Sequence, residues 1–127
     1  MNWIITDVLI QAAKILAETH QTDFFIRDEG LLESAVNRPL NTFYYNSDSD
    51  ICDLAAEYAF GLIKNHPFFD GNKRLAYVAC RLFLLINSID IKSSQINKYK
   101  KIIALAENKI TQKEFALWLK ANTMEKF

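Results

Sequence analysis

Apolar side chains recur at helical spacing through most of this chain. The most regular run follows the i, i+3, i+4, i+7, i+8 and i+11 positions of one helix face: Ile51, Leu54, Ala55, Tyr58, Ala59 and Leu62. One further step of four residues reaches His66, so we expect the imidazole to emerge near the end of this buried stripe. A second run, over residues 75–86, is apolar on both sides, which predicts a central helix surrounded by the others.

The same periodicity predicts about six helices, over residues 6–19, 31–37, 51–66, 75–86, 94–107 and from residue 111 onward. Thr6 is placed to cap the first helix, and Arg38-Pro39 is expected to end the second, because proline disfavours helical backbone before it. Thr111 and Glu114 have the spacing of a capping box at the start of the last helix. These elements predict an all-α fold in a single domain spanning residues 1–127.

Three consecutive aromatic residues, Phe43, Tyr44 and Tyr45, interrupt the helical pattern. Aromatic side chains favour extended backbone, so this segment is predicted to be a strand or a short flap. The polar residues 46–49 that follow have the composition of a loop. Simple packing of the three rings over the core is an equally good interpretation of the same segment.

The composition indicates which structural classes of protein this chain can belong to. Half of the residues are hydrophobic, and only three glycines and two prolines are present, which favours a packed helical domain over disorder or a turn-rich sandwich. The net charge of zero gives no global sign of nucleic-acid binding, so we expect no direct nucleic-acid partner. Residues 58–127 carry twelve bases and five acids, which suits an anionic ligand, although solvated helix faces explain the bias more simply.

Several features predict a cytoplasmic location. Cys52 and Cys80 lie inside apolar helical patterns, where buried free thiols suit a reducing compartment. The N-terminal region has no basic stretch followed by an apolar one, so no signal peptide is expected. The apolar run over residues 75–86 contains Arg81 and is too short to cross a bilayer, so we expect no membrane association.

The candidate chemistry is concentrated in residues 66–74, which read HPFFDGNKR and precede the central helix. Pro67 stops the preceding helix and holds His66 outside the right-handed helical region. A neutral imidazole on such a rigid turn can accept a proton from an attacking hydroxyl. A histidine at a helix end is more often a structural cap, but the neighbouring residues favour a catalytic role.

Residues 70–74, which follow His66 in this motif, are suited to binding phosphate. Asp70 would repel a phosphate unless a cation such as Mg²⁺ bridged the two, although it is also placed to cap the helix. Gly71 lets the backbone approach a ligand closely, and Asn72 offers an amide donor. Lys73 supplies a mobile charge and Arg74 a rigid fork of donors. Together these residues predict a site for phosphoryl or nucleotidyl transfer with Mg²⁺.

The motif resembles the signature of the Fic/Doc superfamily, which in its adenylylating branch reads roughly His-Pro-Phe-x-Asp/Asn-Gly-Asn-Gly-Arg-x-x-Arg. Lys73 and Tyr77 depart from that version and match the Doc (death-on-curing) branch, whose signature reads His-x-Phe-x-Asp-x-Asn-Lys-Arg. The likeness covers roughly residues 4–120. It includes Doc-like blocks in the same order at residues 27–35, 38–39, 53–56 and 58–61.

This resemblance implies the compact Fic fold and the toxin of a type II toxin–antitoxin system. Doc toxins are similar to protein kinases in activity: they move the γ-phosphate of ATP to a hydroxyl of elongation factor Tu and halt translation. Carried over by motif position, His66 would be the base and Asp70 the Mg²⁺ ligand. The ATP phosphates would bind at Gly71, Asn72, Lys73 and Arg74.

Two alternative functions stay open. Fic-type adenylylation would transfer AMP instead, but Lys73 and Tyr77 disfavour the nucleotide pose in which the α-phosphate reacts. The second alternative is a binding partner that keeps the fold but has lost the catalytic activity. The motif residues are all present, which argues against that loss.

The resemblance also implies partners. The inhibitory helix of self-inhibited Fic proteins, with the pattern Ser/Thr-x-x-x-Glu-Gly/Asn, is not found in the sequence. We therefore expect control by a separate antitoxin whose disordered tail folds into an apolar groove. Phe43, Tyr44 and Tyr45 are the candidate flap that would pair with an extended segment of the protein substrate.

Overall fold

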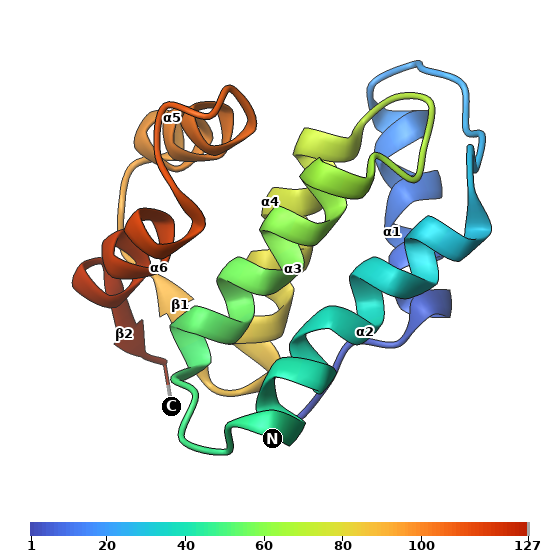
Figure 1. Cartoon of the computed structure of the whole chain (residues 1–127). Helices are drawn as coiled ribbons and strands as arrows, with labels where there is room; N and C mark the ends of the chain where they lie inside the picture. Colours follow the sequence, from blue (N-terminus) through green and yellow to red (C-terminus); the bar gives the residue numbers. More distant parts are fainter. Residues whose placement is uncertain (127) are drawn as a thin grey trace.

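The computed structural model describes residues 1–126, which form six helices and two short strands (Figure 1). Their bounds are Thr6–Thr19 (α1), Glu29–Tyr45 (α2), Ile51–Asn65 (α3), Asn72–Ile86 (α4), Ile89–Ile91 (β1), Gln95–Ala106 (α5), Gln112–Ala121 (α6) and Thr123–Glu125 (β2). The predicted helical fold with six helices is confirmed. None of the helices of residues 1–126 combines the length and apolarity needed to cross a bilayer.

Helices α3 and α4 lie side by side at the centre of the molecule (Figure 1). Helix α3 also packs against α2 and α6, whereas α4 also contacts α1, α5 and β1. The rings of Tyr58 on α3 and Phe83 on α4 are 5.0 Å apart in the core, and both side chains are fully buried. The predicted central helix, α4, therefore shares this position with α3.

Helix α2 differs most from the sequence-based prediction. It continues through Pro39 to Tyr45, so the predicted end at Arg38-Pro39 is wrong. The predicted strand or flap at residues 43–45 is wrong as well, because these residues form the last turn of α2. Proline removes only one helical hydrogen bond, and contacts on both sides of Pro39 hold the helix together. Arg38 pairs with Glu57 before it, and the ring of Phe43 packs on Trp3 after it, at 5.5 Å between centroids.

One of the two predicted N-terminal caps is formed. The capping box of Thr111 and Glu114 is formed, with the two backbone-to-side-chain bonds at 3.0 and 3.1 Å. Helix α1 begins at Thr6, but Ile5 is its N-cap residue and no side chain caps the helix, so the predicted Thr6 cap is not formed. Cys52 and Cys80 are both buried and free, as predicted.

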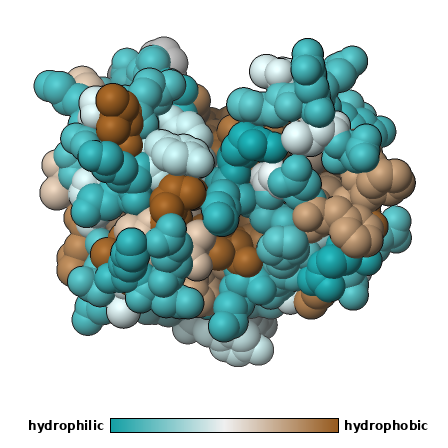
Figure 2. Space-filling view, turned by 90° about the horizontal axis from the view of Figure 1, so that it is seen from above, coloured by the Kyte–Doolittle hydropathy of each residue, from teal (hydrophilic) through white to brown (hydrophobic). Residues whose placement is uncertain are grey.

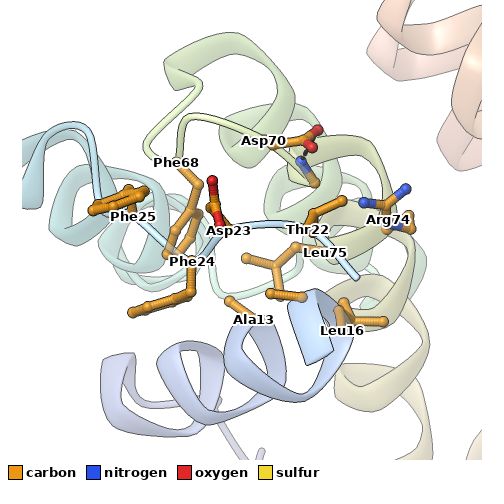
Figure 3. A pocket seen from close by; sticks show the side chains of 12 residues that line it. Ala13, Leu16, Thr22, Asp23, Phe24, Phe25, Phe68, Asp70, Arg74 and Leu75 are labelled. Atoms are coloured by element: carbon orange, nitrogen blue, oxygen red, sulfur yellow. Dashed lines mark hydrogen bonds between the residues drawn. The ribbon is translucent and has the colours of Figure 1, made fainter. Parts of the chain in front are cut away.

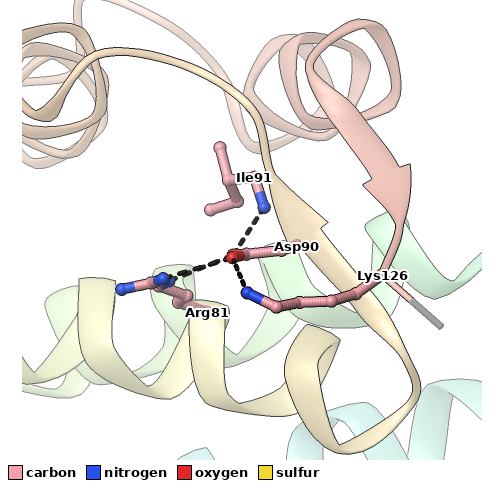
Figure 4. A network of polar contacts seen from close by, with 4 residues as sticks. All are labelled: Arg81, Asp90, Ile91 and Lys126. Carbon is pink, nitrogen blue, oxygen red and sulfur yellow. Dashed lines mark hydrogen bonds and ion pairs between the residues drawn. The ribbon is translucent and has the colours of Figure 1, made fainter.

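The two strands were not predicted. β1 and β2 pair antiparallel with Ile89 opposite Glu125 and Ile91 opposite Thr123, which ties the end of the chain to the segment after α4. Figure 4 shows the polar cluster that fixes this segment, in which Asp90 accepts hydrogen bonds from Arg81 and Lys126. This sheet and its cluster therefore hold β1 and β2 against α4.

Candidate active site

His66 immediately follows α3 and is exposed. Its backbone lies in the left-handed region (φ 50°, ψ 55°), and its N–H donates to Leu62 O at 3.2 Å. Left-handed backbone costs a residue other than glycine about 1–2 kcal/mol, so the surrounding structure has to hold it. Pro67 ends the helix here, as predicted, and the imidazole side chain is therefore carried on a fixed turn.

The motif loop, residues 66–71, is held by the segment between α1 and α2. Phe68 forms an antiparallel bridge with Ile26, and the Phe69 N–H donates to Phe25 O at 3.2 Å. The phenyl ring of Phe68 is buried, whereas those of Phe25 and Phe69 are more than half exposed and meet edge to face. Figure 3 shows this segment beside the motif loop, with Phe24 and Phe25 close to Phe68.

Asn72 holds the loop that follows His66. Its side chain is buried, its Nδ2 donates to Phe68 O at 2.8 Å, and its Oδ1 accepts from Phe68 N at 3.1 Å. Both ends of the side chain therefore hold the loop. Because Nδ2 carries a second N–H, the predicted binding of phosphate by Asn72 stays a prediction. Its backbone N–H remains part of the first turn of α4, where the N–H groups have no intrahelical acceptor.

Gly71 connects the loop to α4. Its backbone is left-handed (φ 82°, ψ 10°), a conformation that glycine adopts at little cost, and it is the N-cap residue of the helix. A Cβ atom built on it would lie 3.7 Å from a terminal nitrogen of Arg74. The guanidinium of Arg74 therefore lies back over the glycine, beside the open N–H groups of the helix.

The two cations of the motif differ in their surroundings. Lys73 is exposed, whereas Arg74 is half-buried. Arg74 Nε is buried and has no hydrogen-bond partner within residues 1–126. Both cations lie in the first turn of α4, so their charges add to the positive end of the helix dipole.

Asp70 is exposed at the tip of the loop. One of its oxygens, Oδ1, accepts from the Gly71 N–H at 2.7 Å. Asp70 does not cap α4, because Gly71 is the N-cap residue and no side chain accepts there. No group of three His, Cys, Asp or Glu side chains in the described part of the chain could hold a metal alone. A single carboxylate that shares Mg²⁺ with substrate phosphates needs no such group.

These residues line one cleft of about 420 Å³ between the motif loop and α5. His66, Phe69, Asp70, Gly71, Asn72, Lys73 and Arg74 form one wall, and Tyr99 and Ala106 come from α5. Figure 2 looks down on this end of the molecule and shows a largely hydrophilic surface, hollowed between two lobes. A second cavity near Arg74, shown in Figure 3, measures only about 20 Å³, which is room for a water and not for a nucleotide.

Sequence reasoning missed two residues at this site. Tyr99 reaches the cleft from α5, and Arg27 binds the turn that carries His66. Tyr99 gave no signal because its neighbours in the sequence, Lys98, Lys100 and Lys101, form no catalytic or binding motif. Arg27 belonged to a block that resembles Doc proteins, but nothing in its spacing pointed to His66.

The predicted flap residues do not reach the cleft. Tyr44 and Tyr45 are 84% and 85% exposed at the end of α2, and Phe43 packs on Trp3. Packing over the core, the alternative interpretation of this segment, therefore holds for Phe43. The extended segment that does lie beside the motif loop is residues 24–28.

Comparison with known proteins identifies the family of this chain. The model of the Fic/DOC family matches residues 3–84, which include the whole motif and helices α1 to α3. The chain belongs to the Fic/DOC family. It is also 42% identical over 67 residues to Toxin Doc of Mycolicibacterium smegmatis. That alignment spans about half of this chain and about half of the relative, 52% of each.

Proposed function

We propose that this chain is the toxin of a type II toxin–antitoxin pair and acts as a Doc-like protein kinase. It would transfer the γ-phosphate of ATP to a Ser or Thr hydroxyl of a translation factor, elongation factor Tu being the expected substrate, and so inhibit translation in the cytoplasm. The observation that carries this proposal is the shared cleft of His66 and the cationic first turn of α4. The similarity to Toxin Doc supports it.

The proposed reaction needs one base and one anion site. The substrate hydroxyl oxygen attacks the γ-phosphorus, His66 accepts the hydroxyl proton, and the bond to the β–γ bridging oxygen breaks, so that ADP leaves. Lys73, Arg74 and the open N–H groups of α4 bind the phosphate oxygens and stabilise the charge that develops on them. Gly71 lets the nucleotide approach these N–H groups.

Mg²⁺ fits this arrangement. Asp70 is the acidic side chain that lines the cleft, and its Oδ2 makes no hydrogen bond within residues 1–126. We infer that Asp70 holds the ion together with phosphate oxygens of ATP. When bound, Mg²⁺ would neutralise part of the triphosphate charge.

The branch of the family is inferred from two positions. Lys73 places a long cation where the adenylylating pattern has glycine. Tyr77 replaces the second arginine of that pattern and does not line the cleft; its hydroxyl is buried without a partner among the described residues. The cleft therefore lacks the arginine that would seat the nucleotide for α-phosphate transfer, which favours the kinase over the adenylyltransferase.

Induced expression in bacteria tests the toxin proposal. We expect the wild-type chain to arrest growth and His66→Ala to relieve the arrest, because the base is lost. His20→Ala is the matched control, since the sequence has only these two histidines and His20 does not line the cleft. Arrest by a stably folded His66→Ala variant would remove His66 from the mechanism and favour the silent binding partner.

The transferred group is tested separately with ATP labelled at either phosphate. Incubation with purified elongation factor Tu should transfer label from the γ-position and none from the α-position. Transfer from the α-position would establish adenylylation and refute the kinase proposal.

The antitoxin is proposed to bind a groove along α5, which shares Tyr99 with the cleft. A groove of about 680 Å³ lies there, with an apolar floor that includes Ile96, Tyr99 and Ile103 and with Lys100 and Lys109 at its sides. Ile96 and Tyr99 are 68% and 59% exposed, so both side chains are open to a partner. An acidic amphipathic helix, formed when a disordered antitoxin tail binds, complements both the apolar floor and the lysines.

Neutralisation in cells tests this groove. Ile96→Asp should stay toxic but should no longer be rescued by the co-expressed cognate antitoxin, because the substitution puts like charge and a polar group on the floor. Leu117→Asp, at an exposed position of α6, is the control and should still be rescued. Full rescue of Ile96→Asp would exclude the α5 groove as the antitoxin site.

Substrate docking is proposed at residues 24–28 instead of residues 43–45. This segment is already extended and bridges to the motif loop at Ile26 and Phe68. An extended piece of the protein substrate laid along it would bring a hydroxyl toward His66 by strand addition.

A further inference from the structure

One arginine binds three consecutive carbonyl groups of the turn that carries His66. Arg27 Nε donates to His66 O at 2.7 Å, and its Nη2 donates to Asn65 O at 2.8 Å. The backbone N–H of Arg27 donates to Pro67 O, also at 2.7 Å, and the Asp28 N–H shares that acceptor at 3.1 Å. No other residue within 1–126 makes as many bonds to this turn.

The bonds act on the two peptide groups that flank the Cα atom of His66. The Asn65 carbonyl belongs to the peptide before that atom, and the His66 carbonyl belongs to the peptide after it. Fixing both peptide planes fixes φ and ψ of His66, and these angles determine where its Cβ points. This matters because the observed angles, φ 50° and ψ 55°, are not ones that a histidine prefers.

The planar guanidinium suits this task. Its donors are held in a rigid fork, so two carbonyl oxygens can be bound at once in one orientation. The last carbonyls of a helix have no intrahelical donor, and Pro67 has no N–H to offer them. The positive charge is also favourable at the C-terminal end of α3. A lysine would keep the charge but would not hold both peptide groups in register.

We propose that Arg27 is a positioning residue that orients the His66 imidazole into the cleft. This inference rests on the proposed function of His66 as the base. Arg27 does not line the cleft, and its side-chain bonds go to the backbone of residues 65 and 66. It therefore acts through His66 and not on ATP.

The test uses three variants of the full chain. Arg27→Met removes the fork, and Arg27→Lys keeps only the charge. Arg81→Met is the matched control, because Arg81 also makes a two-point contact, with Asp90, but lies outside the cleft. Each variant is measured by thermal unfolding, by steady-state phosphate transfer from ATP to elongation factor Tu, and by NMR of the histidine ring Cε1–Hε1 signals.

The histidine signals are a direct readout because the sequence contains only His20 and His66. Arg27→Met should shift or broaden the His66 signal and leave the His20 signal unchanged. It should lower kcat about 10- to 100-fold, as expected for a displaced base, with the KM for ATP within about twofold. Arg27→Lys should lie between wild type and Arg27→Met, and Arg81→Met should keep the wild-type His66 signal.

Two results would overturn the inference. One is a wild-type His66 signal and a wild-type kcat in a folded Arg27→Met chain. The other is the same signal change and the same loss of kcat in Arg81→Met, since general loss of stability would then explain both. If Arg27→Met does not fold, Arg27→Lys is judged by the same readouts. Full activity of His66→Ala would refute the proposed base, while the NMR result would still decide whether Arg27 orients the ring.

Discussion

Asn72 holds Phe68 through both ends of its side chain. Nδ2 donates to the Phe68 carbonyl at 2.8 Å, and Oδ1 accepts from the Phe68 N–H at 3.1 Å. These bonds replace the backbone partners that Phe68 would have in a helix, and both residues are buried. The asparagine of the motif therefore shapes the loop between His66 and Asp70, whose ends carry the proposed base and metal ligand.

Asn72→Ala should destabilise the fold strongly. The substitution leaves the N–H and the carbonyl of buried Phe68 without partners, which costs about 2–4 kcal/mol of unfolding free energy. Urea denaturation monitored by tryptophan fluorescence measures the change. Asn41→Ala is the control, because Asn41 is exposed on α2 and the change there should stay within about 0.5 kcal/mol. Equal small effects at both positions would show that the Asn72 bonds are dispensable.

Asp90 should make the fold sensitive to acid (Figure 4). The hydrogen bond from Arg81 holds the pKa of the Asp90 carboxyl well below its usual range. The unfolded chain then binds a proton at a pH where the folded chain does not, so this stabilisation is present above about pH 4 and is lost as the pH falls further. Asp90→Asn should remove that dependence and cost about 1–2 kcal/mol at pH 7.

The acid effect is measured by urea denaturation between pH 2 and 7. Asp48→Asn is the control, since Asp48 is exposed and forms no ion pair within residues 1–126. If Asp90→Asn lost stability with falling pH as the wild-type chain does, Asp90 would not be the group that makes the fold sensitive to acid.

The two cysteines should be protected in the folded chain. Burial raises the pKa of Cys52 to about 11 and also raises the pKa of Cys80 above its ordinary value of 9.0. Because the thiolate is the reactive form, both thiols should react slowly with a disulfide reagent at pH 8, and two should react at once in urea. Since the unfolded chain loses these protons first, stability should also fall above about pH 9. Rapid titration of one thiol in the native chain would contradict the burial.

Local patterns predicted much of the fold. The apolar stripe from Ile51 to Leu62 and the capping box at Thr111 depend on neighbours within one or two helical turns, so the sequence reveals them directly. The sequence did not predict that α2 continues through Pro39, because tertiary contacts of Arg38 and Phe43 outweigh the helix-ending effect of the proline. The strands β1 and β2 are three residues long and pair across more than thirty residues, which no local pattern reports.

The sequence predicted which residues of the motif form the site, but it did not predict how they are arranged in space. The clustering of His66, Asp70 and the two cations follows from their closeness in the sequence, since all four lie within residues 66–74. The use of the Asn72 side chain on Phe68 could not be foreseen, because it depends on how the loop folds back on itself. Arg27 and Tyr99 come from distant segments, so only the packed structure brings them to the loop and the cleft.

Phosphate transfer by the purified chain tests the central claim most directly. With ATP labelled at the γ-position, Mg²⁺ and elongation factor Tu, the wild-type chain should label the factor. His66→Ala should do so about 10²- to 10⁴-fold more slowly while remaining folded. Transfer at the wild-type rate by His66→Ala, or label that arrives only from the α-phosphate, would contradict the account.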